Sequence, residues 1–303
     1  MKDFLSINEC STKELRELLN LSSQLKRLYM TGNQDTCLSG KVLAMLFEKP
    51  SLRTRISFQV AMADLAGTAI YVKPEDIGGI GKREPVKDIA RVLSRYVDGI
   101  MARTFEHKTI TELAEFATVP VINALTDRSH PCQAMADVLT IQEHLGKLEG
   151  VKIAFIGDGN NVARSLAFAC AKLEMKMVIA TPACYELDAE TTEEANKISA
   201  GSVSQTSEPA QAVAGADIIY TDTWVSMGQE QEKKKRIKDF EGFQVNAELL
   251  KSAPEGAKIM HCLPAYRGLE ITDEVAESAN SIIFDQSENR LTFQRALLKR
   301  LMG

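Results

Sequence analysis

The 303-residue sequence lacks the features that mark membrane-spanning, secreted and nucleic-acid-binding proteins. No apolar run approaches the roughly 18 residues of a membrane span, and the first residues hold no apolar core typical of a secretion signal. The net charge of −5 argues against general nucleic-acid binding, so we expect any arginine cluster to act locally on a small anion. We therefore expect no membrane and no nucleic-acid partner.

Cysteine is also scarce, with six residues that lie far apart: Cys10, Cys37, Cys132, Cys170, Cys184 and Cys262. No two of them form a Cys-x-x-Cys pair, which speaks against a zinc site and against a disulfide framework. Reduced thiols are typical of a cytoplasmic protein, and we expect that localisation. We expect neither a metal nor a cofactor.

The sequence does contain a regular alternation of apolar strands and helical patterns, which predicts βαβ units and parallel sheets. In the first half we expect strands at 41–47, 69–73, 99–103 and 119–123, with helices at 53–66, 86–97 and 109–117. The alternation restarts at Val151, with strands at 152–156, 176–180, 203–206, 217–221, 258–261 and 281–285. The predicted fold class is α/β, with two open parallel-sheet domains flanked by helices.

Interdomain helices are expected to join these domains. A helix over 131–145 leaves the first half, and a last helix over 288–302 is long enough to pack back on it. We predict a first domain of residues 1–135, completed by the C-terminal helix 287–303, and a second domain of residues 136–286.

Two segments of the sequence show no regular pattern. The Gly-rich, charged segment 74–84 indicates a mobile loop. Residues 222–245 form the longest irregular segment, and a loop of that length in an α/β domain is usually functional or disordered. We interpret its charged run, 229–236, as a solvated face.

The most informative stretch is the turn Ser51-Leu52-Arg53-Thr54-Arg55, between the first strand and the next helix. Amides at a helix N-terminus are unpaired and the helix dipole is positive there, so the turn is a ready anion site. Two hydroxyls and two guanidiniums add donors suited to phosphate oxygens. Taken alone, the stretch is equally compatible with a helix cap beside two solvated arginines. We expect Gly67 to cap the other end of this helix.

Polar residues follow most of the predicted strands, at the carboxyl ends where ligands bind in open α/β sheets. These positions are Ser51 to Arg55, Arg103, His130, Gln133, Asn160, Asn161, Asp222, Ser226, His261 and Cys262. Several have an ordinary alternative, such as a snorkelling Arg103, a capping His130, a turn-capping Asp222 or a core Cys262. Their shared location predicts one site in a cleft between the two domains.

A dinucleotide site is a further hypothesis, because Gly157 and Gly159 follow a predicted strand. The pattern departs from the dinucleotide fingerprint, since Val162 stands where Gly or Ala is needed. The next strand ends at Thr181 without the carboxylate that would bind the ribose hydroxyls. We therefore do not expect NAD binding.

With these residues assembled, the sequence resembles the aspartate/ornithine carbamoyltransferase family, and within it the ornithine-specific group. The signatures are Ser51-Leu52-Arg53-Thr54-Arg55, His130-Pro131-Cys132-Gln133, Asp222-Thr-Trp-Val-Ser226-Met227-Gly228 and His261-Cys262-Leu263-Pro264. They occur in order over essentially the whole chain, and the third is similar to the ornithine-specific loop.

The resemblance implies transfer of the carbamoyl group of carbamoyl phosphate to the side-chain amine of L-ornithine, which gives L-citrulline and phosphate. The residues it implies for carbamoyl phosphate are Ser51, Leu52, Arg53, Thr54, Arg103, His130, Gln133, Cys262, Leu263 and Arg290. The residues it implies for ornithine are Asn161, Asp222, Ser226 and Met227. As catalytic residues it implies Arg103, His130, Asp222 and Cys262. No general base is evident, so we expect the site to select the deprotonated amine.

The resemblance also implies a homo-oligomer, a trimer or a multiple of trimers, with sites at subunit interfaces. In relatives the loop corresponding to 78–84 offers a polar side chain to the neighbouring subunit's ligand, at the position of Gly79. Here Lys82, Arg83 or backbone amides alone could take that part. Leu52 replaces the Thr that many relatives carry, and we expect little effect because only its amide need contact phosphate.

Other functions remain open from the sequence alone. A sister transferase could act on putrescine or an acylated ornithine, although Asp222, Ser226 and Met227 favour a free α-amino acid. A catalytically silent homologue could serve as a binding or regulatory subunit, although the signature residues are all retained. A dinucleotide-dependent oxidoreductase would require measurable NAD binding.

Overall fold

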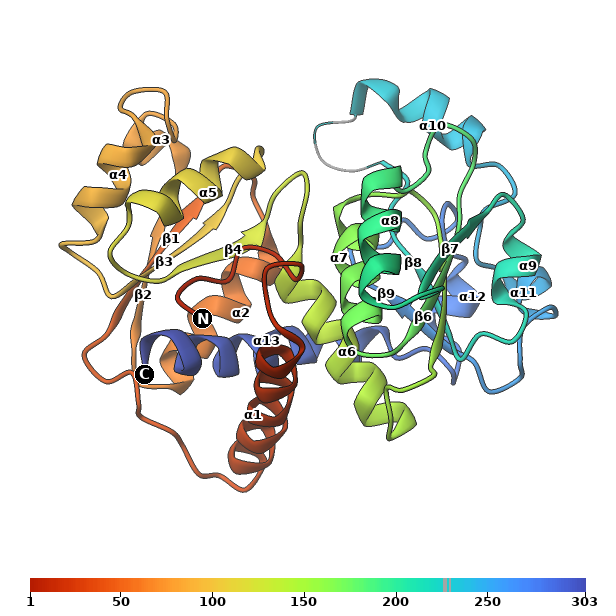
Figure 1. The fold of residues 1–303 in the computed structure, drawn as a ribbon, viewed down its shortest axis with the longest axis horizontal. Coiled ribbons are helices and arrows are strands. Elements are labelled where there is room, and N and C mark those ends of the chain that lie inside the picture. The colour runs from red at the N-terminus through yellow and green to blue at the C-terminus, as the bar shows by residue number, and fades with distance from the viewer. Residues whose placement is uncertain (226–227, 229) are drawn as a thin grey trace. The chain divides into compact units, whose positions relative to one another are not determined.

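The computed structural model of the chain describes residues 1–225, 228 and 230–303. The chain folds into two units, Met1–Leu139 with Glu288–Gly303, and Thr140–Ser287. The boundaries fall within helices α6 (Pro131–Leu145) and α13 (Ile283–Met302), so these two helices connect the units (Figure 1). Each unit is an open parallel sheet flanked by helices, which confirms the predicted fold class.

The first unit contains a parallel sheet whose described strands follow the order β2-β1-β3-β4. The strands are β1 (Val42–Phe47), β2 (Thr68–Val72), β3 (Gly99–Arg103) and β4 (Val121–Leu125). The central strands β1 and β3 are almost wholly buried, which explains their unbroken apolar sequences. Phe47 pairs with Arg103, so both strands end at the same edge.

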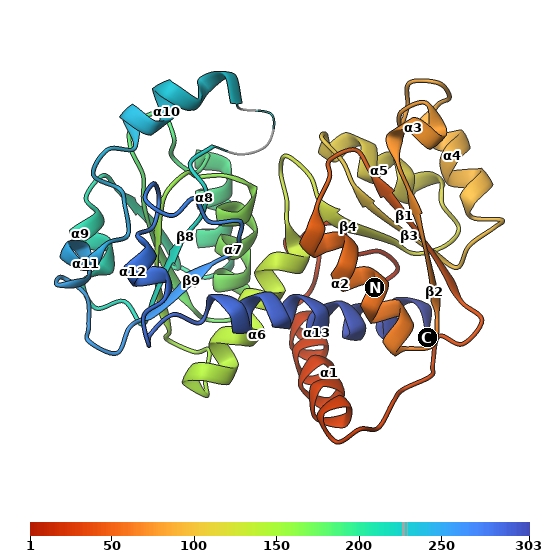
Figure 2. The ribbon, with the colours of Figure 1, turned by 180° about the vertical axis from the view of Figure 1, so that it is seen from behind.

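Helices cover both faces of this sheet. They are α1 (Thr12–Met30), α2 (Leu52–Asp64), α3 (Pro74–Ile77), α4 (Val86–Leu93), α5 (His107–Phe116) and the C-terminal part of α13. Residues of α4 and α5 pack on Leu46, Ile100 and Ala102. Helices α1, α2 and α13 lie on the opposite face (Figure 2). A Cβ on Gly99 would lie 2.8 Å from Sδ of Met302, so the end of α13 packs directly on β3.

The second unit contains a parallel sheet whose described strands follow the order β7-β6-β5-β8-β9. The strands are β5 (Lys152–Ile156), β6 (Lys176–Ala180), β7 (Val203–Thr206), β8 (Ile218–Thr221) and β9 (Lys258–His261). The first strand in sequence, β5, is central and buried from Ile153 onward.

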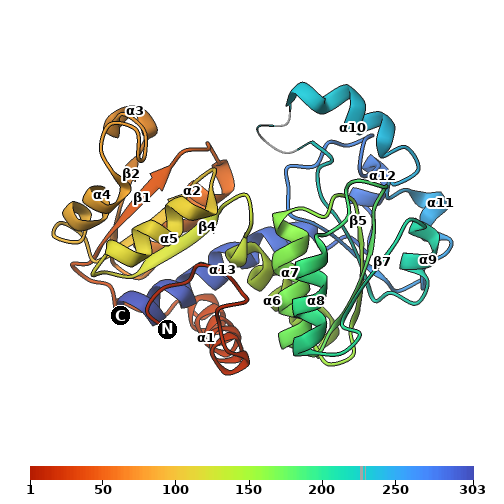
Figure 3. The same ribbon diagram turned by 45° about the horizontal axis from the view of Figure 1, so that its top comes forward.

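Helices also cover both faces of the second sheet. They are α7 (Asn161–Lys172), α8 (Ala189–Ile198), α9 (Pro209–Val213), η1 (Glu230–Glu232), α10 (Lys233–Asp239), α11 (Ala247–Leu250) and α12 (Asp273–Ala276). Helices α7 and α8 lie side by side over one face (Figure 3). On the other face, Val213, Phe240 and Val275 join one apolar core with Ile219 of β8.

The predicted strand 281–285 is wrong, and the last helix begins earlier than the predicted 288. Ser281 forms an isolated bridge with Ile259, and α13 begins two residues later at Ile283. The run 281–285 has the apolar, β-branched pattern of a strand. In the structure Ile283 is buried in the core of the second unit as the first residue of a helix. Although α13 has 20 residues, no described helix is long and apolar enough to cross a membrane.

Two segments predicted as irregular contain helices. The segment 222–245 includes η1 and α10, and the charged run 229–236 is not wholly a solvated face because Arg236 is buried. The segment 74–84 begins with α3, after which Gly78 and Gly79 have φ of 69° and 86°.

The end of α2 also differs from the prediction. The left-handed residue after this helix is Ala66, with φ 63°, whereas Gly67 has no positive φ. A Cβ on Gly67 would lie 2.5 Å from Cε of Met62 and 3.2 Å from Cβ of Leu38. Gly67 is therefore not the left-handed residue of the cap, but its N–H bonds to the carbonyl of Met62 at 2.8 Å and closes the helix end, and its lack of a Cβ allows close packing.

Candidate active site

The chain order within each sheet locates a candidate ligand position. In the first sheet the chain moves from β1 outward to β2 and then returns to β3, so the direction reverses between β1 and β3. In the second sheet the corresponding reversal lies between β5 and β8. Ligands of open α/β sheets bind beyond the carboxyl ends of strands at such switch points. Ser51 and Arg103 lie at the first switch point, and Asn160 and Asp222 at the second.

The turn after β1 has the geometry of an anion site. Ser51 caps α2, and its Oγ accepts a hydrogen bond from the backbone N–H of Thr54 and donates to Oγ1 of Thr54, at 3.3 and 3.1 Å. Leu52 and Arg53 occupy the first turn of α2, so their amides lie at its positive end. No acidic residue occurs in this first turn. The turn therefore presents backbone amides at a positive helix end, the groups to which anions bind.

Arg290 of α13 binds to residues on two other helices of the first unit. Its Nη1 donates to Oε1 of Gln133 at 2.6 Å, and its Nη2 donates to Oγ1 of Thr54 at 3.2 Å. Gln133 in turn donates from Nε2 to Oδ1 of the buried Asp137 at 2.7 Å. All four residues are buried, so a third guanidinium is held rigidly beside the α2 turn.

His130 and Arg103 complete this half of the site. Both are 5% exposed, although they carry polar side chains. Burial, followed by the positive charges of Arg290 and Arg103, holds the pKa of His130 well below its usual value of 6.5. His130 is therefore a neutral imidazole near neutral pH. It can donate a hydrogen bond from one nitrogen without adding another positive charge.

Two residues of the turn face away from this cluster. The side chain of Leu52 is 74% exposed, which leaves its amide as the group available to a ligand. The guanidinium of Arg55 stacks over the ring of Tyr71, 4.0 Å from its centroid. After the ligand that the resemblance implies, we call a set of residues of the first unit the phosphate half-site: Ser51, Leu52 through its amide, Arg53, Thr54, Arg103, His130, Gln133 and Arg290.

A separate cavity of about 430 Å³ lies in the first unit between the segment after β2 and the start of α5. Its walls carry both signs of charge, with Glu48 and Glu112 beside Lys82 and Lys108. Lys82 packs over Gly79, where a Cβ would lie 2.8 Å from Cδ of the lysine. The glycine thus makes room for the lysine stem.

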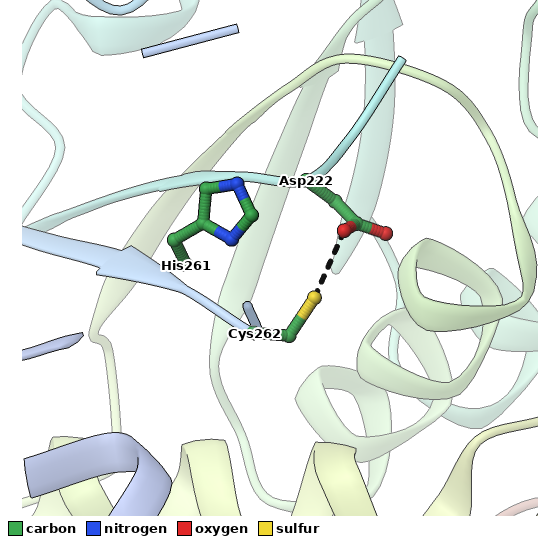
Figure 4. A group of neighbouring side chains, drawn as sticks. All are labelled: Asp222, His261 and Cys262. Atoms are coloured by element: carbon green, nitrogen blue, oxygen red, sulfur yellow. Dashed lines mark hydrogen bonds between the residues drawn. The ribbon is translucent and has the colours of Figure 1, made fainter. Parts of the chain in front are cut away.

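Asp222 is the centre of the polar cluster in the second unit. Its Oδ2 accepts from Nδ2 of Asn160 at 2.8 Å, and its Oδ1 accepts from the backbone N–H of Thr223 at 2.7 Å. Sγ of Cys262 donates to the same Oδ1 at 2.9 Å (Figure 4). The structure thus brings together two residues, Asp222 and Cys262, that are 40 positions apart in the sequence. After the ligand that the resemblance implies, we call Asn160, Asn161, Asp222 and Cys262 the amino-acid half-site.

The remaining predicted residues of this half are placed as follows. Asn161 is the first residue of α7 and is partly exposed, next to the capping residue Asn160. Leu263 follows Cys262 with φ 57° and a cis peptide bond to Pro264. Ser226 and Met227 lie outside the described residues.

A buried ion pair adjoins the amino-acid half-site. Arg236 of α10 donates from Nη2 to Asp158 and from Nε to the carbonyl of Trp224, and its guanidinium lies 4.6 Å from the ring centroid of Tyr185. Burial raises the pKa of Asp158 to about 6, and the nearby Asp222 acts in the same direction, although Arg236 opposes both. The pair fixes α10 to the turn after β5.

The side chains of Asp222, His261 and Cys262 also form a set that could hold a metal ion, with ligand atoms within 4.8 Å of one another (Figure 4). Both nitrogens of His261 are already engaged: Nε2 lies 3.1 Å from Oε1 of Glu270, and Nδ1 accepts from the N–H of Leu263 at 2.9 Å. Hydrogen bonding within the protein therefore accounts for this set of side chains.

Sequence reasoning placed Asn160 at a strand end but did not foresee that its side chain orients Asp222. It also missed two buried pairs in this unit, Asp158 with Arg236 and Glu270 with His261. The only sequence signal was the position of Asn160 and Asp158 directly after a strand. Gly159, one basis of the dinucleotide hypothesis, has a different role, because a Cβ there would overlap the backbone of Glu186 and Leu187.

Two α/β units with polar residues at both switch points define a class of proteins that bind small ligands at the carboxyl edges of parallel sheets. Comparison with known families narrows that class. Residues 2–143 match the carbamoyl-P binding domain of aspartate/ornithine carbamoyltransferase, and residues 149–301 match its Asp/Orn binding domain. The chain therefore belongs to the aspartate/ornithine carbamoyltransferase family.

Relatives match over nearly the whole chain. An ornithine carbamoyltransferase of Methanocorpusculum labreanum is 50% identical over 99% of this chain and 98% of its own length. The solved structure of the Pyrococcus furiosus ornithine carbamoyltransferase superposes with a TM-score of 0.97 at 48% identity, covering 100% of this chain and 97% of that one. The crystal structure of the Thermus thermophilus ornithine carbamoyltransferase superposes with a TM-score of 0.91 at 45% identity, covering 100% of this chain and 99% of that one.

Proposed function

We propose that the chain is an ornithine carbamoyltransferase, which transfers the carbamoyl group of carbamoyl phosphate to the side-chain amine of L-ornithine and releases L-citrulline and phosphate. The observation that carries the choice of ornithine is the acidic character of the amino-acid half-site. The carboxylate of Asp222 lies in this half-site, and the charge of the adjoining Asp158 is balanced by the buried cation Arg236, so Asp222 supplies the net negative charge. Such a site attracts a cationic amino acid and disfavours the additional carboxylate of aspartate.

The phosphate half-site supports binding of carbamoyl phosphate. We assign the phosphate group to the amides and hydroxyls of Ser51, Leu52 and Thr54, with Arg53 and Arg103 balancing its charge. Arg290 is already oriented by Gln133 and Thr54, so it can contact the ligand with little rearrangement. The carbamoyl amide is assigned to Gln133 and to the carbonyl of Leu263.

Attack of the amine on the carbonyl carbon places negative charge on the carbonyl oxygen. Arg103, Thr54 and neutral His130 supply hydrogen-bond donors for that oxygen, and each such donor contributes about 2 to 4 kcal/mol at the transition state. The carbon–nitrogen bond forms, the bond to the phosphate oxygen breaks, and phosphate departs with the electron pair. The amine proton passes to phosphate or solvent. The proposed reaction uses no metal and no cofactor.

The ornithine assignments are Asn161, Asp222, Ser226 and Met227 for the α-amino and α-carboxylate groups. Asp222 and Cys262 would orient the side-chain amine, which must be neutral to attack. Because the carbamoyl carbon must reach that amine, a bisubstrate phosphonate that carries both ligands should compete with both substrates.

The deciding experiment measures citrulline formation by purified protein with carbamoyl phosphate and a panel of amines: L-ornithine, putrescine, Nα-acetylornithine and L-aspartate. We expect turnover with L-ornithine to exceed that with each other amine. Preference for putrescine or acetylornithine would contradict the substrate assignment. A well-folded protein that forms no carbamoylated product would contradict the enzyme assignment.

A matched pair of variants tests the amino-acid half-site. Asp222→Asn should raise the KM for ornithine and lower kcat, because Oδ1 and Oδ2 accept from Cys262 and Asn160. Asp239→Asn serves as the control, since Asp239 of α10 bonds to Lys235 and Tyr185, which lie outside the half-site. Equal kinetic effects in the two variants would contradict the assignment of Asp222.

The oligomeric state and location form part of the same proposal. We propose a homotrimer or a multiple of trimers in the cytoplasm, with segment 78–84 contributing to the neighbouring subunit's site. The exposed apolar side chains of Leu52, Ile56 and Ile70 support a covered surface on the first unit. Sedimentation should give a multiple of three times the 33.4 kDa chain mass. A monomer that is fully active would contradict the shared-site arrangement.

A further inference from the structure

His261 occupies the end of β9 with an exposure of only 1%, and its hydrogen bonds define the protonation of its ring. Nδ1 accepts from the backbone N–H of Leu263 at 2.9 Å, so this nitrogen carries no hydrogen. The ring is therefore neutral with its hydrogen on Nε2, which donates to Oε1 of Glu270 at 3.1 Å. The backbone N–H of His261 itself donates to Oε1 of Gln286 at 2.9 Å.

Glu270 is equally buried and is held in place by its own contacts. Oε1 also accepts from the backbone N–H of Tyr266 at 2.6 Å, and the carbonyl of Glu270 accepts from the N–H of Val245 at 2.8 Å. Among the described residues, Oε2 of Glu270 makes no hydrogen bond. All the side-chain hydrogen bonds of this buried carboxylate are therefore made by Oε1, which accepts from His261 and Tyr266.

We propose that Glu270 and His261 form a positioning pair that sets the geometry of Cys262 and Leu263. This inference rests on the proposed function, in which Cys262 orients the substrate amine and the Leu263 carbonyl binds the carbamoyl amide. The Glu270 carboxylate selects the Nε2–H form of His261. In that form Nδ1 is unprotonated and accepts the hydrogen bond from the backbone N–H of Leu263. The backbone of Leu263 lies in the left-handed region, with φ 57°.

The positioning pair also affects the hydrogen bond between Cys262 and Asp222. Cys262 lies between His261 and Leu263, so fixing both neighbours fixes the direction of its thiol toward Oδ1 of Asp222, the bond drawn in Figure 4. The other imidazole form would direct an N–H at the N–H of Leu263, and two donors cannot bond to each other. Without the carboxylate, the Leu263 backbone loses its anchor in a conformation that leucine seldom adopts.

The test compares three variants by citrulline formation. Glu270→Gln keeps an oxygen that can accept from His261 and Tyr266, whereas Glu270→Leu removes it. Ile271→Ala is the matched control, because Ile271 is a fully buried neighbour in the same segment. We expect Glu270→Leu to lower kcat/KM for ornithine about 10- to 100-fold, the cost seen when a residue that orients a metal-bound histidine is removed. Glu270→Gln should retain most of the activity, and Ile271→Ala should lower only thermal stability.

Two further measurements need no turnover. The rate of alkylation of Cys262, measured by mass spectrometry relative to that of the exposed Cys184, should change in Glu270→Leu but not in Ile271→Ala. Nitrogen NMR of the four histidines should show Nε2 of His261 protonated and Nδ1 unprotonated in the wild type, with assignment by His261→Gln. These readouts stay valid if the wild type forms no citrulline, a result that would contradict the proposed function alone.

Several outcomes would overturn the proposal. An Nδ1–H form of His261 in the wild type would do so even where Glu270→Leu fails to fold. Unchanged activity and unchanged Cys262 alkylation in Glu270→Leu would also do so. Equal loss of activity in Glu270→Leu and Ile271→Ala would show that Glu270 merely stabilises the segment.

Discussion

The guanidinium of Arg290 donates to Oε1 of Gln133 at 2.6 Å, although the two residues are 157 positions apart in the sequence. The same guanidinium donates to Oγ1 of Thr54. Three helices of the first unit are thereby joined at one polar point. Because the arginine is oriented by the protein itself, little side-chain entropy need be lost when an anion binds.

Replacement of Arg290 by Gln should lower kcat/KM for carbamoyl phosphate by about 10²- to 10³-fold, as expected for loss of one preorganised donor. Arg295→Gln is the matched control on the same helix. Its guanidinium bonds to Asp64 and stacks on Tyr29 at 4.1 Å, remote from the turn at Ser51. For Arg295→Gln, steady-state kinetics should show unchanged KM values, and thermal unfolding should show a loss of stability.

Arg53 and Arg55 form a second matched pair, two residues apart on α2. Arg53→Ala should raise the KM for carbamoyl phosphate about 30-fold or more, because truncating one partner of a charge pair costs about 2 kcal/mol or more. Arg55→Ala should leave that KM nearly unchanged, since Arg55 stacks on Tyr71. A larger effect for Arg55 than for Arg53 would contradict the assigned phosphate half-site.

The pH dependence of the reaction should follow the substrate amine and not His130. Burial and the charges of Arg290 and Arg103 hold the pKa of His130 well below 6.5, so this group is neutral throughout the neutral range. We expect kcat/KM for ornithine to rise with pH toward the amine's own pKa of about 10. A profile that stays flat through that range, or that breaks near pH 6.5 and loses the break in His130→Asn, would contradict this account.

The Asp158–Arg236 pair predicts a pH-dependent contribution to stability. The pKa of Asp158 is raised from 3.8 to about 6, mainly by burial, so between these values the folded state binds more protons than the unfolded state. The contribution of Asp158 to the free energy of unfolding should therefore fall by roughly 3 kcal/mol as pH rises through this window. Denaturant unfolding should show that the free energy of unfolding of the wild type, minus that of Asp158→Asn, falls from pH 4 to pH 7. A difference that grows would give Asp158 a lowered pKa.

The sequence predicts the fold well wherever local pattern and tertiary burial agree. Strand 99–103 and helix 131–145 were predicted with the observed bounds, because each has a single strong pattern. The prediction failed at 281–285, where a strand-like apolar run supplies the buried start of α13. It also failed at Arg236, since a lysine-rich run gives no sign that one of its cations is buried beside Tyr185.

For the candidate site, sequence reasoning found the residues at strand ends but not those that hold them. Ser51 and Asp222 are signalled by the strands before them. Glu270 has no such signal, because its relation to His261 depends on how the chain returns after Pro264. Contacts of this kind are set by tertiary folding, which local periodicity does not encode.

Helix α13 gives the protein a particular order of assembly during its synthesis. The first unit is built from the first 139 residues and the last 16, which are separated by all of Thr140–Ser287. A ribosome therefore releases β1 through β4 long before it makes Arg290, and the ring of Phe4 must wait for Phe293, its neighbour at 5.8 Å. All strands of the second unit are made before α13 is complete, so its sheet can form before the first unit is finished. The turn at Ser51 thus acquires the guanidinium of Arg290 only after the whole second unit has been made.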